Sequence, residues 1–102
     1  MIHVKLMPEF MCDPIWHDGG SEMGPISPFD LPISRSLAQA VSDWDKKYQE
    51  TYNDSYPPDS GFSSLENEEA FYREGETLVG KLQKELGDNY RVRQHFPGWK
   101  KT

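Results

Sequence analysis

The chain has 102 residues, 35% hydrophobic residues, one cysteine and a net charge of −6. This length predicts one domain over residues 1–102, a single cysteine excludes an intrachain disulfide, and no apolar run approaches the ~20 residues that span a bilayer. The start lacks the apolar stretch and cleavage site of a signal peptide, so we expect a cytoplasmic protein.

The acidic residues are concentrated in the middle of the chain. Residues 9–76 contain fifteen acidic and four basic residues, a net charge of −11, whereas residues 81–102 carry a net charge of +4. An acidic surface repels phosphate backbones and attracts basic partners. The charge pattern therefore disfavours direct nucleic-acid binding and favours a basic protein partner.

The first predicted element is a strand at the start of the chain. Apolar side chains alternate with His3 and Lys5 over residues 2–6, which is the pattern of a half-buried strand, and Pro8 ends its regular pairing. Residues 11–33 contain four prolines and three glycines. We expect them to form one long ordered loop, of the kind that carries function or packs against the core.

The first predicted helix covers residues 34–52, with Ser34 as its N-cap. Its apolar side chains recur every three or four residues, which defines one buried stripe. The members of that stripe are Leu37, Ala40, Val41, Trp44 and Tyr48.

A second helix is predicted over residues 63–87, after a turn rich in proline, glycine and polar residues. Ser63 and Glu66 fit a capping box, and Gly87 is a typical residue at a helix end. Gly75 lies within the buried stripe, which predicts a close approach of the two helices there. The stripe consists of Phe71, Leu78, Leu82 and Leu86.

The last predicted element is a strand over residues 89–96, in which apolar and charged side chains alternate before Pro97. The element order is therefore strand, long loop, helix, helix, strand. The two strands should pair with each other in parallel, because two antiparallel helices return the chain to its starting side. We predict an α+β fold in which a helical hairpin packs on a small two-stranded sheet.

The stretch "EFMCDPIWHDGG", residues 9–20, contains the residues most suggestive of chemistry. Zinc takes four ligands, whereas this stretch offers Cys12 and His17, and only strand pairing could bring His3 and His95 together. A nucleophilic cysteine needs a nearby cation or a helix N-terminus, but Cys12 lies among acids. We therefore predict no catalytic residue, no metal and no cofactor, with Cys12 as a structural cysteine.

Trp16, in the same stretch, has two interpretations. A large aromatic residue on a proline-flanked loop is either a lid on the helical core or an exposed anchor for a partner. The acidic residues likewise form either a solvated surface or a face complementary to a basic partner.

Four segments resemble a known family. They are "CDPIW" (12–16), "LPIS" (31–34) at the start of a helix, "SGFSS" (60–64) and "FYREGETLVGKLQKELG" (71–87). Over residues 2–96 the chain is similar to small stand-alone bacterial proteins and to cytoplasmic immunity proteins of contact-dependent growth inhibition and related polymorphic toxin systems. The resemblance implies a non-enzymatic protein that binds one cognate toxin domain, often a nuclease, and blocks it.

These observations lead to the hypothesis of an antitoxin that covers the basic active-site surface of a nuclease. We expect it to be a monomer that forms a heterodimer with the toxin and does not bind a membrane. The expected partner-binding residues are Trp16 as the apolar anchor and the acids Asp18, Glu22, Asp54, Asp59, Glu66 and Glu69. Two alternatives remain at this stage. One is a small enzyme or metal protein using Cys12 and His17, and the other is an adaptor subunit of a larger complex.

Overall fold

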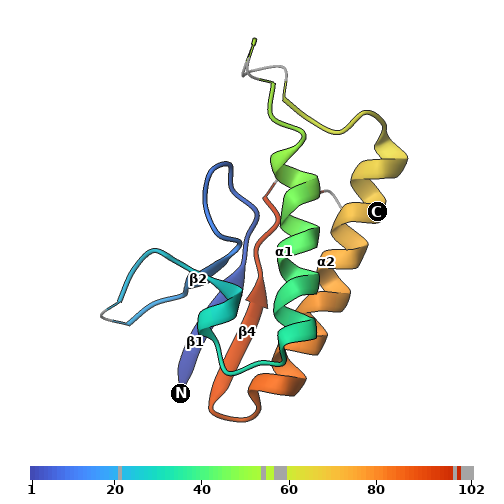
Figure 1. Ribbon diagram of the computed structural model, residues 1–102. Coiled ribbons are helices and arrows are strands. Elements are labelled where there is room, and N and C mark those ends of the chain that lie inside the picture. Colours follow the sequence, from blue (N-terminus) through green and yellow to red (C-terminus); the bar gives the residue numbers. More distant parts are fainter. Residues whose placement is uncertain (21, 54, 57–59, 98, 100–102) are drawn as a thin grey trace.

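The fold has two layers, a sheet and a hairpin of two helices that covers one of its faces (Figure 1). A computed structural model describes residues 1–20, 22–53, 55–56, 60–97 and 99. In chain order the elements are β1 (Ile2–Leu6), β2 (Ile15–His17), β3 (Pro25–Ile26), the 3-10 turn η1 (Pro28–Asp30), α1 (Arg35–Gln49), α2 (Leu65–Leu86) and β4 (Tyr90–Gln94).

The sheet has the strand order β3-β2-β1-β4. β1 runs parallel to β4, with Ile2 opposite Tyr90, as the return of the chain through two helices predicts. The other side of β1 pairs antiparallel with β2, and β2 pairs antiparallel with β3. The α+β class is therefore confirmed, but the two-stranded sheet is wrong, because the predicted loop 11–33 supplies two further strands.

Local contacts explain why the loop forms strands. After β1 the chain reverses over residues 7–14, where the Met7 N–H donates to the Pro14 carbonyl at 2.8 Å and so places β2 beside β1. The turn from β2 to β3 contains three glycines with positive φ, among them Gly19 at 103°. Glycine adopts this backbone conformation without the steric cost that a side chain brings.

Serine caps both helices. The Ser34 hydroxyl accepts a hydrogen bond from the Leu37 N–H at 3.2 Å, as predicted for α1. In α2 the cap is Ser64, which accepts from the Asn67 N–H at 3.1 Å, so the predicted capping box at Ser63 is wrong by one residue. The Ser63 hydroxyl instead accepts from the Asn67 side chain at 2.7 Å.

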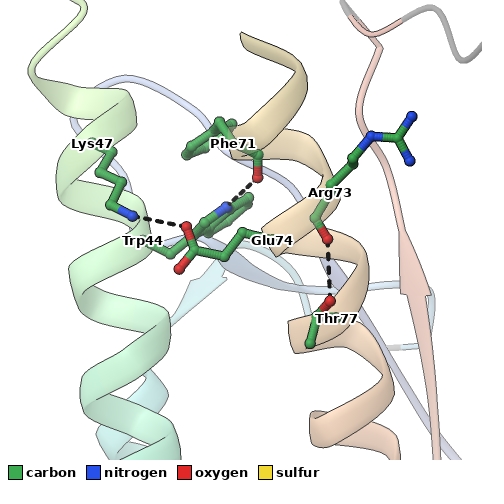
Figure 2. Close-up of polar contacts among 6 residues, drawn as sticks. All are labelled: Trp44, Lys47, Phe71, Arg73, Glu74 and Thr77. Atoms are coloured by element: carbon green, nitrogen blue, oxygen red, sulfur yellow. Dashed lines mark hydrogen bonds and ion pairs between the residues drawn. The ribbon is translucent and has the colours of Figure 1, made fainter. Parts of the chain in front are cut away.

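Aromatic side chains fill the contact between the helices. Trp44 of α1 is fully buried, stacks on Phe71 of α2 at 4.4 Å and donates its indole N–H to the Phe71 carbonyl at 2.8 Å (Figure 2). A methyl group on Gly75 would lie 2.7 Å from Trp44 and 2.8 Å from Phe96. The absence of a side chain at Gly75 therefore makes room for the rings of Trp44 and Phe96, rather than for the backbone of α1 as predicted.

The core lies between the sheet and the helices. The sheet contributes Val4, Leu6 and Ile15, and the helices contribute Leu37, Val41, Trp44, Phe71, Tyr72, Leu78, Leu82 and Leu86, with Phe96 after β4. Within the described residues, neither helix combines the length and the apolar character needed to cross a membrane.

Candidate partner-binding site

The residues suspected of metal chemistry do not converge. Among the described residues, no three His, Cys, Asp or Glu side chains are grouped as metal ligands. Parallel pairing places His3 opposite Arg91, whereas the His95 N–H bonds the Leu6 carbonyl at the other end of β1. Four residues of strand separate the two levels, roughly 13 Å, so strand pairing does not bring His3 and His95 together.

Trp16 lies on the sheet face that points away from the helices. It stands opposite Lys5 on β1, while its neighbour Ile15 points to the core and is 1% exposed. The half-buried indole donates its N–H to the Met7 carbonyl at 3.0 Å. Trp16 is therefore not a lid on the helical core, and its ring is held in place on the opposite face.

Asp18 follows β2 on the same face as Trp16. Its carboxylate accepts two hydrogen bonds from the Arg93 guanidinium of β4, at 2.9 and 3.1 Å, so the pair reaches across β1. The hydrogen bond from Arg93 lowers the pKa of Asp18, and the same bond raises the pKa of Arg93. Asp18 is thus an ionised acid that fixes the position of a cation.

Glu22 lies in the connection between β2 and β3, with its carboxylate 3.3 Å from the His17 imidazole. Beside it is a cleft of about 510 Å³. Its lining is Met1, Ile2, His3, Val4, His17, Gly19, Gly20, Glu22, Ile26, Asp30, Leu31 and Tyr90. Glu22 therefore borders a hollow near the N-terminus whose lining is both polar and apolar.

Glu66 and Glu69 lie at the start of α2, in an acidic part of the helix. Residues 65–76 contain five glutamates and one base, Arg73, which binds Glu69 at 2.6 Å one turn away. The positive end of the helix dipole favours carboxylates at this position. We call Glu66, Glu68 and Glu69 the acidic edge.

A second cleft, of about 480 Å³, separates the end of α1 from the start of α2 next to the acidic edge. Lys47 of α1 and Glu74 of α2 both line this cleft, and an ion pair of 2.9 Å joins their side chains (Figure 2). Asn67 and the aromatic residues Phe62 and Phe71 contribute to its wall. The lining of the cleft is therefore mixed, with charged, polar and aromatic side chains.

The predicted site residues therefore fall into two groups. Trp16, Asp18 and Glu22 belong to the sheet and its β2–β3 turn, whereas Glu66 and Glu69 belong to the acidic edge, which Figure 1 places well apart from them at the start of α2. The predicted residues Asp54 and Asp59 lie outside the described residues. The sequence did not indicate that the first group shares its face with several cations.

The chain is thus a small α+β protein, with an acidic helix edge on one layer and an anchored tryptophan on the other. The family model described as Serratia CdiI immunity protein-like matches residues 2–96, and the chain belongs to this family. Among proteins of curated function, none matches the chain. The family consists of immunity proteins, which are typically non-enzymatic, so the predicted family and the predicted lack of enzymatic activity are confirmed.

Proposed function

We propose that this protein binds a cognate CdiA toxin domain one-to-one in the cytoplasm and neutralises it by covering a basic, nucleolytic surface. Family membership implies toxin neutralisation. The observation that favours a basic nuclease is the acidic edge on a chain of net charge −6. A nuclease needs positive charge to hold a phosphate backbone, and that charge attracts the edge.

The acidic edge is suited to a rapid encounter. Glu66 and Glu69 are exposed on a regular helix, so a partner reaches them without rearranging the fold. The Arg73–Glu69 pair is a surface ion pair, which contributes little to stability and can be exchanged for a cation of the toxin. Complementary charges raise association rates toward ~10⁸–10⁹ M⁻¹s⁻¹ at low salt.

Charge reversal of the edge tests this proposal. We expect the variant Glu66→Lys/Glu69→Lys to associate with the purified toxin domain about tenfold more slowly at low salt, and the difference to shrink at high salt. The control Asp43→Lys/Asp88→Lys changes the net charge equally at two exposed positions outside the edge. Stopped-flow association and thermal melting of both variants separate binding from folding.

The outcomes separate the two parts of the proposal. Equal association rates for both double variants would remove the edge from the interface. A toxin domain that keeps its nuclease activity in the presence of one equivalent of wild-type protein would contradict neutralisation itself. Nucleic-acid cleavage by the toxin, abolished at one equivalent, is the result we expect.

A further inference from the structure

The sheet face that points away from the helices carries a cluster of cations. Lys5 of β1 stands between Trp16 of β2 and Arg93 of β4, so the three side chains form one row across three strands. In the neighbouring row, His3 stands opposite Arg91. We call these five residues the open sheet face.

This face is uncovered in the described part of the chain, because α1 and α2 both pack on the other side of the sheet (Figure 1). His3, Arg91 and Arg93 are exposed, and Lys5 and Trp16 are half-buried. Strands β1, β2 and β4 contain no acidic residue, and Asp18, directly after β2, is paired with Arg93. The open sheet face is thus positive in a chain whose net charge is −6.

The side chains at the centre of this face are held in position before any partner arrives. The Trp16 indole donates to the Met7 carbonyl at 3.0 Å, and Asp18 holds the Arg93 guanidinium by two hydrogen bonds. Trp16 and Arg93 stand on paired strands rather than on loops. Fixed side chains lose little conformational freedom on binding, which favours affinity.

The residue types are those of protein–protein interfaces. Tryptophan and arginine carry much of the binding energy in such interfaces, and methionine is also enriched there. The adjoining β2–β3 turn presents Met23, which is 91% exposed, and the N-terminus presents Met1 at 72%. The planar guanidinium group of arginine also pairs with carboxylates through two parallel hydrogen bonds.

The charge of the face selects an acidic occupant, and the aromatic content of the face favours a polypeptide over a nucleic acid. Sequence-tolerant binding of single strands uses several aromatic side chains for stacking, whereas the described residues place Trp16 alone on this face.

We propose that the open sheet face binds an acidic, extended segment of the toxin polypeptide, as a second contact beside the acidic edge. This inference rests on the proposed function for the identity of the partner. The two surfaces lie on different layers of a molecule whose longest dimension is 41 Å. An extended segment of about thirteen residues spans roughly 43 Å, so one toxin chain reaches both surfaces.

The first test compares two double variants with the same change of charge. Lys5→Glu/Arg91→Glu reverses the open sheet face, and Lys81→Glu/Lys84→Glu reverses two exposed lysines near the end of α2. We expect the first variant to bind the toxin domain at least about tenfold more weakly by calorimetry, and the second to bind within about threefold of wild type. Equal affinities of the two variants would overturn the inference while leaving the proposed function in place.

The second test does not depend on the toxin. A decapeptide of glutamate and a ten-nucleotide oligothymidine are titrated separately into ¹⁵N-labelled protein, and amide chemical shifts are followed. We expect the peptide to shift resonances of β1, β2 and β4, and the shifts to disappear in Lys5→Glu/Arg91→Glu. Shifts with the oligonucleotide alone, or with neither probe, would overturn the inference.

If the wild-type protein binds no toxin domain, the proposed function fails, and the peptide titration still decides whether this face takes an acidic segment. The control variant Lys81→Glu/Lys84→Glu should keep the peptide-induced shifts, because its substitutions lie outside the face. Loss of the shifts in both variants would mean that net charge alone attracts the peptide, which contradicts a local site.

Discussion

Gly75 and Gly80 lie on the same helix. Because their surroundings differ, adding a methyl group should have opposite effects on stability at the two positions. A Cβ on Gly75 would lie 2.7 Å from Trp44 and 2.8 Å from Phe96, whereas a Cβ on Gly80 would meet nothing within 4 Å. Alanine gains about 1 kcal/mol of helix propensity over glycine, but overpacking a core costs about 1–3 kcal/mol.

We therefore expect Gly75→Ala to lower the free energy of unfolding by about 1–2 kcal/mol and Gly80→Ala to raise it by about 0.5–1 kcal/mol. Urea unfolding of both variants checks the prediction, with Gly80→Ala as the matched control. Stabilisation by both substitutions would show that the aromatic cluster moves aside at no cost.

Asp45 of α1 carries a charge that the fold disfavours. Burial raises the pKa of this half-buried carboxyl, and the hydrogen bond from Gln49 and the nearby Asp13 change it less. A raised carboxyl pKa means that ionisation destabilises the folded state relative to the unfolded one. This penalty is absent well below the usual value of 3.8 and grows as the pH rises through the folded pKa.

Asp45→Asn should accordingly stabilise the protein at pH 7, by less than about 1 kcal/mol because the carboxyl remains partly hydrated. Asparagine keeps an oxygen that accepts the 3.2 Å hydrogen bond from Gln49. Thermal melting at pH 7 and pH 3 provides the measurement, and the stabilisation should disappear at pH 3. A gain that persists at pH 3 would show that charge is not its cause.

Asp18 should show the opposite sign. Arg93 lowers the pKa of Asp18, so the ionised form stabilises the fold above pH 3.8, and this stabilisation is lost as the pH falls through the folded pKa. We expect Asp18→Asn to lower the melting temperature at pH 7 and to have less effect in acid. Identical melting curves at pH 7 would contradict a stabilising role for the Asp18–Arg93 pair.

Residues that pack along a helix were predictable from the sequence, whereas residues that act across elements were not. The stripe through Leu37 and Trp44 has helical spacing, so its burial followed from the pattern. Asp18 was predicted to bind a partner, but Arg93 lies 75 positions away and only strand pairing brings the two together. No local signal in a sequence records such a pairing.

At the scale of elements, the exposed edge of β4 is completed by a side chain of α2. The Gln83 amide donates to the Tyr90 carbonyl at 2.8 Å and accepts from the Val92 N–H at 2.8 Å. This side chain therefore satisfies the strand edge as a neighbouring strand would. Unpaired strand edges are sites of unwanted association between chains.

Removing the Gln83 amide should destabilise the fold and expose the backbone groups at the edge of β4 to solvent. We expect Gln83→Leu to lower the free energy of unfolding by about 1–3 kcal/mol, because a donor and an acceptor on β4 lose their partner. Gln39→Leu, which removes only an exposed bond to Asp43, is the control. Amide exchange at Val92 should accelerate in the first variant alone, and unchanged exchange would show that water replaces Gln83 fully.

The two strands that the sequence analysis missed are short. β2 has three residues and β3 has two, so neither is long enough to display an alternating pattern. Pro25 and the glycines of the intervening turn instead indicated a loop. Proline is compatible with β3 because this strand lies at the edge of the sheet, where one N–H needs no partner.

At the scale of the whole molecule, the sheet joins the two ends of the chain. β1 begins at residue 2 and pairs along its whole length with β4, which ends at residue 94. Between them, α1 and α2 pack on the same sheet through one continuous core. β4 can pair with β1 only after the two helices have returned the chain to the sheet. We therefore expect the sheet and the helices to unfold together rather than separately.

A substitution in the sheet should therefore destabilise the helices by the same amount. Val4 of β1 is 1% exposed, and we expect Val4→Ala to lower the free energy of unfolding by about 2 kcal/mol, whether far-ultraviolet circular dichroism or tryptophan fluorescence, which includes Trp16 of β2, reports it. Ile2→Ala on the same strand should cost less than about 1 kcal/mol, because Ile2 is already 48% exposed.

Coincident transitions from the two probes would establish the single domain that the chain length predicts. Separate transitions, with the helical signal surviving after the sheet has melted, would mean that the hairpin of α1 and α2 folds by itself. In that case the acidic edge and the open sheet face would belong to units of different stability, and a toxin bound to both would raise the melting temperature of each.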